Sequence, residues 1–289
     1  KPVNKGGISG RTEATGRGVK YALKAFFEND IDVKKTGLEK GLKGKKIIVQ
    51  GLGNVGYYAA YFLSTEDNAI ITHVIERDGA IINEEGIDIK SLKSYLISNG
   101  TIRGFKGFVD SGPEILEEKA DILIPAAMEL VINKDNADRI QSPVIIEAAN
   151  GPISSEADDI LIKKGKIIIP DLYANAGGVT VSYFEWIKNL SRIRLGRLQR
   201  RAQESQMSNL IKGIEAMTGK EFPLALKSRT VQGLSECDLV FSGLEDTMTE
   251  TYEAISRLWN SEADIPDLRT AAMMIAVKRI VQSYSSMGI

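Results

Sequence analysis

Residues 45–76, KKIIVQGLGNVGYYAAYFLSTEDNAIITHVIE, constrain the fold more than any other stretch of the chain. The apolar run 47–49 is typical of a parallel strand buried on both faces. Gly51, Gly53 and Gly56 then form the pattern G-x-G-x-x-G. The first glycine permits a tight turn, the second lets a phosphate approach the backbone, and the third lets a helix pack on its strand. The stretch therefore predicts a strand, a glycine turn and a helix in that order.

Glu76 ends a second apolar run, residues 69–75, twenty positions after the last glycine. A carboxylate at this position accepts hydrogen bonds from the adenosine ribose of a dinucleotide. A glycine-rich turn alone also occurs without a nucleotide, but the full order of elements favours a bound dinucleotide, with phosphates at a helix beginning near Asn54. Because the Glu76 charge would repel a 2′-phosphate, we expect NAD. Arg77 would offset part of that repulsion, so NADP is the alternative cofactor.

The composition limits the other classes of function. The 289 residues suffice for one large domain with an appendage, and a formal net charge of -1 gives no reason to expect nucleic acid or a membrane surface as partner. The single cysteine, Cys237, excludes an intrachain disulfide. Because there is only one histidine, His73, a zinc-type metal site is not expected. A structural role is favoured for the side chains of both Cys237 and His73. No apolar run is long enough to span a membrane.

Apolar runs alternate with helical patterns through the first two thirds of the chain. Ser9 is a plausible cap for a helix in residues 11–30, and Asp78-Gly79 predicts a tight hairpin turn. Further strands are expected at 120–127, 143–148 and 166–171, and further helices at 87–98 and 154–164. This alternation predicts an α/β fold class, a Rossmann-like, doubly wound and mostly parallel sheet.

Polar or small residues follow the later strands. Ala126, Ala127, Asn150 and Asn175 all come where a strand is expected to end. Asparagine is common in turns for conformational reasons alone. Because ligands of such sheets bind outside the carboxyl ends of the strands, we interpret these residues as the lining of one cleft.

Two segments could also contact a ligand. Arg11 could bind a carboxylate and Thr15 an amide from the start of the first helix, although both could equally be solvated surface residues. Gly177-Gly178 could let the backbone approach a ligand, and the Ser182 hydroxyl near a helix N-terminus could help to hold an anionic group.

Six motifs occur in order across almost the whole chain: GRTEATGRGV, VQGLGNVG, ADILIPAA, EAANGP, IPDLYANAGGVTVSYFEW and DLRTAA. In these motifs the chain resembles the C-terminal, dinucleotide-binding part of the glutamate dehydrogenases, within the Glu/Leu/Phe/Val dehydrogenase family. The resemblance implies oxidative deamination of L-glutamate to 2-oxoglutarate and ammonia by hydride transfer to NAD(P). It also implies a homohexamer, in the mitochondrial matrix or alternatively the cytoplasm, without nucleic-acid or membrane partners.

The same resemblance implies a role for each matching residue. The substrate-binding residues would be Arg11, Asn150, Val179 and Ser182. The cofactor-binding residues would be Thr15, Gly51, Gly53, Asn54, Val55, Gly56, Glu76, Ala126, Ala127, Asn150 and Asn175. The catalytic lysine and aspartate of the family lie upstream of the matching region. Because the chain begins abruptly at Lys1, we expect a missing upstream domain and no turnover by this polypeptide alone.

The domain limits expected from the sequence separate a dinucleotide-binding domain, residues 1–189 and 247–289, from an insertion at 190–246. The insertion combines a basic run, 192–201, with a narrow apolar stripe, 207–217, which predicts a solvated helix with one packed face. By position it resembles the helical antenna of animal-type glutamate dehydrogenases. The final helix is expected to bury one face, formed by Leu268, Ala271, Ala272, Ile275 and Ile280.

Arg17 matches a position of the GTP site of animal enzymes, but the helix after the glycines, 57–62, lacks the arginines that this site also uses. We therefore expect weak or absent inhibition by GTP. Two other functions stay open: a dehydrogenase of leucine, phenylalanine or valine, which Ser182 and the long insertion oppose, and a non-catalytic NAD-binding module.

Overall fold

The computed structural model describes residues 2–191, 197–231, 234–261 and 264–288. The chain forms two compact units. The first unit comprises residues 1–11 and 180–244, and the second comprises residues 12–179 and 245–289. Part of the basic run expected at 192–201, residues 192–196, lies outside the described residues.

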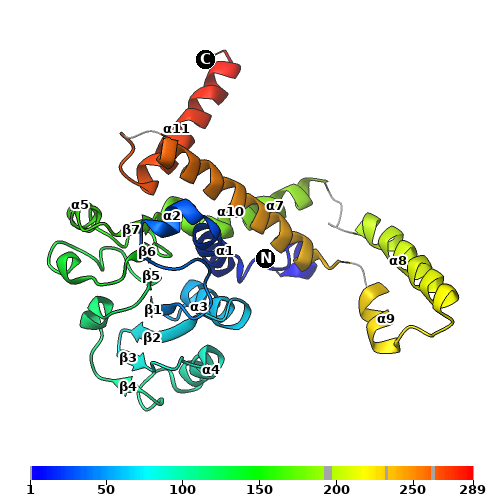
Figure 1. The fold of residues 1–289 in the computed structure, drawn as a ribbon, viewed down its shortest axis with the longest axis horizontal. Coiled ribbons are helices and arrows are strands. Elements are labelled where there is room, and N and C mark those ends of the chain that lie inside the picture. The colour runs from blue at the N-terminus through cyan, green and yellow to red at the C-terminus, as the bar shows by residue number, and fades with distance from the viewer. Residues whose placement is uncertain (1, 192–196, 232–233, 262–263, 289) are drawn as a thin grey trace. The chain divides into compact units, whose positions relative to one another are not determined.

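The second unit contains a seven-stranded sheet with the order β4-β3-β2-β1-β5-β6-β7, which can be followed in Figure 1. β2, β1, β5, β6 and β7 are parallel, whereas β3 and β4 are antiparallel additions at one edge. The strands are β1 (Lys46–Gln50), β2 (Ile70–Glu76), β3 (Gly79–Ile82), β4 (Phe108–Val109), β5 (Ile122–Pro125), β6 (Val144–Ile146) and β7 (Ile167–Ile169). The strand order reverses beside β1, which is where doubly wound sheets bind ligands. The predicted fold class is confirmed.

The helices follow the expected alternation with the strands. Those within the second unit are α1 (Ala14–Glu28), α2 (Asp30–Lys34), α3 (Asn54–Glu66), α4 (Ile89–Asn99), α5 (Ser155–Lys163), α6 (Asp171–Ala174) and α11 (Leu268–Ser286). The first unit contains α8 (Arg197–Thr218) and α9 (Leu224–Val231), while α7 (Gly177–Ser191) and α10 (Glu236–Ser261) contribute residues to both units. Single 3-10 turns lie at η1 (Val3–Lys5), η2 (Pro113–Glu117) and η3 (Ala137–Arg139).

Local sequence signals explain most of these boundaries. The Asp78-Gly79 turn joins the antiparallel strands β2 and β3, as predicted. Ser154 caps α5 by accepting a hydrogen bond from the Ala157 N–H at 3.2 Å. The prediction that Ser9 caps the first helix is wrong, because α1 begins at Ala14 without a side-chain cap. Ser9 instead donates from its N–H and its hydroxyl to a carboxylate oxygen of Glu236.

The last helix is buried only at its start. Leu268, Ala271 and Ala272 are buried, and this part of α11 contacts β7. Ile275 is half-buried and Ile280 is 57% exposed, so the prediction of a buried Ile280 is wrong in this structure. Figure 1 shows the reason, since the C-terminal part of α11 extends away from the sheet.

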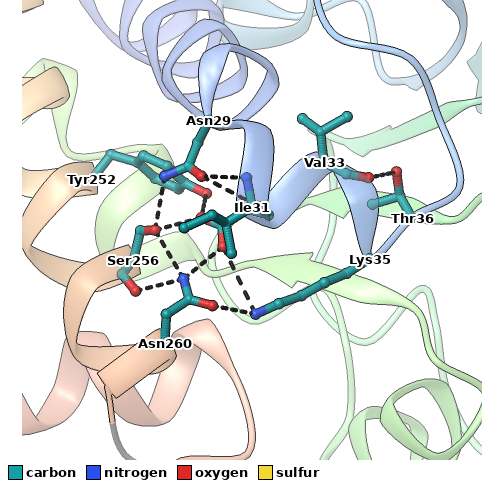
Figure 2. Close-up of polar contacts among 9 residues, drawn as sticks. Asn29, Ile31, Val33, Lys35, Thr36, Tyr252, Ser256 and Asn260 are labelled. Atoms are coloured by element: carbon teal, nitrogen blue, oxygen red, sulfur yellow. Dashed lines mark hydrogen bonds and ion pairs between the residues drawn. The ribbon is translucent and has the colours of Figure 1, made fainter.

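A buried carboxylate joins α2 to α10 within the second unit (Figure 2). Asp32 is fully buried and accepts hydrogen bonds from three side chains of α10. The donors are the Tyr252 hydroxyl at 2.6 Å, the Ser256 hydroxyl at 2.5 Å and the Asn260 amide at 2.8 Å. Burial and the Asp32 charge raise the pKa of Tyr252, so its hydroxyl stays protonated and continues to donate. This network fixes one end of α10 against the nucleotide fold.

Replacing Tyr252 by phenylalanine should lower the free energy of unfolding by about 1.5–2 kcal/mol, because a hydrogen bond to a buried charged group is lost. Urea unfolding followed by circular dichroism measures the change. Tyr284→Phe is the matched control, because Tyr284 is 52% exposed on α11. Equal midpoints for the two variants would contradict a stabilising role for the Tyr252 hydroxyl.

Candidate functional site

The three glycines after β1 differ in what surrounds them. Gly51 has a φ of +89°, and a Cβ there would lie 2.6 Å from the Ala127 Cβ. A Cβ on Gly56 would lie 1.9 Å from the carbonyl oxygen of Gly51. A Cβ on Gly53 would have no heavy atom within 4 Å. The first and third glycines are therefore required by protein packing, and the second faces open space at the start of α3.

Glu76 holds the glycine turn from the end of β2. Its Oε1 accepts a hydrogen bond from the Leu52 N–H at 2.5 Å, and the Gly51 N–H donates to the Ile75 carbonyl at 2.7 Å. The carboxylate expected on the ribose thus also organises the backbone between the first two glycines. A cavity of about 740 Å³ is lined by Gly51, Glu76 and Ala127, among other residues of the second unit. Its volume lies within the range of small-molecule sites.

The later strand ends bring two of the predicted residues together. The Asn175 amide, after β7, donates to the Asn150 side-chain oxygen, after β6, at 2.7 Å. Asn54 at the start of α3 donates to the Thr12 carbonyl at 2.7 Å. In the second unit the structure therefore places these amides at the carboxyl side of the sheet, where the sequence predicted a cleft.

The glycine pair Gly177-Gly178, which the sequence predicted to let the backbone approach a ligand, packs closely against α1. The ligand contact itself stays a prediction. A Cβ on Gly177 would lie 2.4 Å from the Ala14 carbonyl oxygen, and a Cβ on Gly178 would lie 2.4 Å from the Thr15 hydroxyl oxygen. The close approach is therefore between the start of α7 and α1. Thr15, predicted near the nicotinamide, packs against this glycine pair.

The four predicted substrate residues are divided between the two units. Arg11 and Ser182 belong to the first unit, and Asn150 and Val179 belong to the second. Val179 is 74% exposed and Ser182 is half-buried. Arg11 has the acidic partner that its neighbours in sequence did not reveal, because its Nη1 lies 2.7 Å from Glu185 Oε1. The grouping of these residues around one substrate stays a prediction.

An ionic network around the buried carboxylate of Glu147 supports the two asparagine loops, and sequence spacing did not reveal it. The guanidinium of Arg269, at the start of α11, contacts both oxygens of Glu147 at 2.9 and 3.0 Å and Asp158 at 3.0 Å. Glu147 also accepts from the Asp171 N–H at 2.9 Å, and Asp171 accepts from the Gly151 N–H at 2.8 Å. Burial raises the pKa of Glu147, and Arg269 offsets only part of that effect. The network connects the loops that carry Asn150 and Asn175.

The single histidine and the single cysteine of the chain are both at least half-buried. His73 is buried in β2, with Nδ1 2.8 Å from the Thr72 hydroxyl and Nε2 3.0 Å from Glu118. Cys237 is half-buried and is not in a disulfide bond within the part of the chain that the structure describes. Among the residues that the structure describes, no cluster of three or more His, Cys, Asp or Glu could bind a metal ion. The described helices include none with both the length and the apolar character needed to span a membrane.

Comparison with known proteins places this geometry in a family. The chain is 45% identical to a probable glutamate dehydrogenase of Sinorhizobium fredii over 97% of its length and 63% of that protein. It is also 45% identical to the mitochondrial glutamate dehydrogenase of Dictyostelium discoideum over 100% of its length and 57% of that protein. Among solved structures, the chain is similar to the leucine-bound hetero-hexameric glutamate dehydrogenase of Thermus thermophilus, with a TM-score of 0.75 and 25% sequence identity. The match covers 100% of this chain and 56% of that one.

The chain therefore spans about 60% of the length of these curated relatives. The sequence model of the Glutamate/Leucine/Phenylalanine/Valine dehydrogenases matches residues 6–227, and with the doubly wound sheet and the Gly51–Glu76 turn this shows that the chain belongs to that family.

Proposed function

We propose that this chain is the dinucleotide-binding part of a glutamate dehydrogenase, in which L-glutamate is oxidatively deaminated to 2-oxoglutarate and ammonia with NAD as the preferred hydride acceptor and NADP as the alternative. The observation that carries the proposal is the turn after β1. Gly53 faces open space, Glu76 holds the Leu52 N–H, and a cavity opens beside both Gly51 and Glu76. These are the features that a fold needs to bind the adenosine and diphosphate of a dinucleotide.

The remaining roles follow from family resemblance and position. Cofactor contacts are assigned to Thr15, Gly51, Gly53, Asn54, Val55, Gly56, Glu76, Ala126, Ala127, Asn150 and Asn175. Substrate contacts are assigned to Arg11, Asn150, Val179 and Ser182. Ser182 favours glutamate over leucine, phenylalanine or valine, because an apolar side-chain pocket has no use for a hydroxyl. With the catalytic lysine and aspartate outside this chain, we expect it to bind NAD without turning over glutamate.

We assign the assembly and regulation of the enzyme on the same basis: a homohexamer, mitochondrial, with an antenna at 190–246. Weak or absent GTP inhibition is supported by the contacts of Arg17. Its guanidinium donates twice to Glu66, at 3.1 and 2.9 Å, and lies 3.6 Å from the centroid of the Phe62 ring. An arginine held in this way is less available to an incoming phosphate.

The first test is a fluorescence titration of the 289-residue chain with NADH, followed by a glutamate oxidation assay after the upstream part of the enzyme is joined to it. NADH binding without turnover, and turnover after joining, would support the proposal. Turnover by the chain alone would contradict the assignment of catalysis to upstream residues. NADH binding that never leads to turnover would favour a non-catalytic NAD-binding module.

Replacing Glu76 by glutamine should shift the ratio of NADH to NADPH affinity toward NADPH by about tenfold, because the carboxylate charge that repels the 2′-phosphate is removed. Glutamine retains a side-chain oxygen that can accept from the Leu52 N–H, so the turn should keep its shape. Parallel titrations with both cofactors measure the ratio. Glu118→Gln is the matched control, and an unchanged ratio in Glu76→Gln would refute the role of this charge.

A further inference from the structure

Lys93, on α4, binds the same residue of the glycine turn as Glu76 does, but through the carbonyl group instead of the N–H. Its Nζ donates to the Leu52 carbonyl oxygen at 2.7 Å, while Glu76 accepts from the N–H of the same residue at 2.5 Å. The Leu52 side chain is fully buried. The residue between the first two glycines is therefore fixed by two charged side chains and by its own packing. Hydrogen bonds to charged groups are stronger than neutral ones, so the turn is held in one conformation.

Lys93 also lines a cavity beside the second glycine. A cavity of about 450 Å³ is lined by Gly53, Asn54, Tyr57, Lys90 and Lys93, among others. Lys90 precedes Lys93 by three positions, so both can project from one side of α4. Nζ of Lys93 lies 5.5 Å from the centroid of the Tyr57 ring. The cavity thus combines two lysines with the positive end of α3.

The charge of Lys93 has no acidic partner within the described part of the chain, where its contacts are the Leu52 carbonyl and the Tyr57 ring. An ammonium carries three N–H donors, and the Leu52 carbonyl takes one of them. Some lysines of this unit are paired with carboxylates, as Lys46 is with Glu84, and their charge is thereby partly neutralised. Lys93 therefore keeps both charge and donors for an anion that enters beside Gly53.

We propose that Lys93 is a further cofactor-binding residue, which contacts the diphosphate of the dinucleotide while it holds the Leu52 carbonyl. This inference rests on the proposed function and adds a positive charge to a site previously described by glycines and a helix N-terminus. The diphosphate carries the charge that Lys93 recognises, whereas the adenosine part lies on the Glu76 side of the turn. Lys93 therefore matters for ligands with a diphosphate and not for adenosine alone.

The test measures the affinities of wild type, Lys93→Met, Lys93→Gln and Lys93→Arg for NADH, ADP and adenosine. Lys93→Met should bind NADH and ADP about tenfold more weakly, as expected for the loss of one charged hydrogen bond, with adenosine changed less than about twofold. Lys93→Gln keeps an N–H donor for the Leu52 carbonyl but has no charge, so it should behave as Lys93→Met does. Lys93→Arg should retain most of the affinity. Added NaCl should weaken ADP binding more steeply in wild type than in Lys93→Met.

Lys163→Met is the matched control, because Lys163 is an exposed helical lysine on α5 that lines neither cavity. Wild-type affinity for ADP in Lys93→Gln would overturn the inference, because the charge would then be irrelevant. An equal loss for adenosine and ADP would also overturn it, because the effect would come from a distorted turn. If wild type binds NADH and Lys93→Met binds it equally well, the inference fails while the proposed function stands. If wild type binds neither NADH nor ADP, both fail.

Discussion

Replacing Gly56 by alanine should destabilise the second unit by about 3 kcal/mol, the upper range for forcing an extra carbon into a packed interior. The new Cβ would lie 1.9 Å from the Gly51 carbonyl oxygen, which is a backbone atom and cannot rotate away. α3 would have to move off β1, and the glycine turn would lose the geometry that presents Gly53. The melting temperature should therefore fall by about 6–12 °C, since 1 kcal/mol corresponds to about 2–4 °C in a domain of this size. NADH binding should fall below detection.

Gly53→Ala is the matched comparison for this prediction. A Cβ at Gly53 meets no heavy atom within 4 Å, and the φ of −67° suits alanine, so stability should be unchanged. The same Cβ would occupy the space through which a diphosphate approaches the backbone, so NADH should bind at least about tenfold more weakly. Differential scanning fluorimetry and NADH titration separate the two effects. Equal melting temperatures for both variants would show that Gly56 is not required by packing.

Replacing Arg269 by methionine should destabilise the second unit by about 3 kcal/mol at pH 7, because it leaves the buried Glu147 carboxylate without its cation. Glu147 is fully buried, and Arg269 contacts both of its oxygens. Urea unfolding measures the loss. Arg139→Met is the control: Arg139 pairs with Glu117 at the surface with 58% of its side chain exposed, and its removal should not change the midpoint measurably.

The pH dependence of Arg269→Met follows from the direction of the Glu147 pKa. Burial raises this pKa in the folded protein, and loss of Arg269 should raise it further. A carboxyl group whose pKa is higher in the folded than in the unfolded protein lowers the free energy of unfolding at a pH where the group is ionised in both states. This penalty disappears as the pH falls from the pKa of the folded state to that of the unfolded state. The deficit of the variant relative to wild type should therefore shrink between pH 7 and pH 5. Adding Glu147→Gln should recover part of the stability at pH 7. A deficit that is constant with pH would contradict this account.

The nucleotide-binding unit could be predicted because its signals are local. The apolar run at 47–49, the glycine spacing and the acid at Glu76 all lie within 32 consecutive residues. The apolar run allows burial of a strand, the glycine spacing allows a tight turn and close packing of the helix, and the acid can accept hydrogen bonds from a ribose. β1, α3 and β2 consequently lie where the sequence placed them. The prediction of a hairpin at Asp78-Gly79 succeeded for the same reason.

The contacts that the sequence did not reveal, and the helix cap that it assigned wrongly, involve partners that are distant in sequence. Ser9 was a reasonable helix cap by local pattern, but the carboxylate that binds it lies 227 residues away. Arg11 lacked a nearby acid in sequence, and its partner Glu185 lies 174 residues away. The backbone at Gly177-Gly178 packs against α1, a contact that the local pattern did not reveal. Local periodicity also overestimated the burial of Ile280, because periodicity shows which residues share a face but not what covers it.

By itself the sequence determined the class of fold, the strand–turn–helix that would hold a dinucleotide, and the family. These depend on spacing along the chain, which backbone geometry converts directly into structure. The tertiary structure was needed to show how the turn is held, by Glu76 at the Leu52 N–H and by Lys93 at the Leu52 carbonyl, and how Arg269 supports the asparagine loops. Those contacts join residues from different elements, and their formation depends on the packing of the whole sheet with its helices.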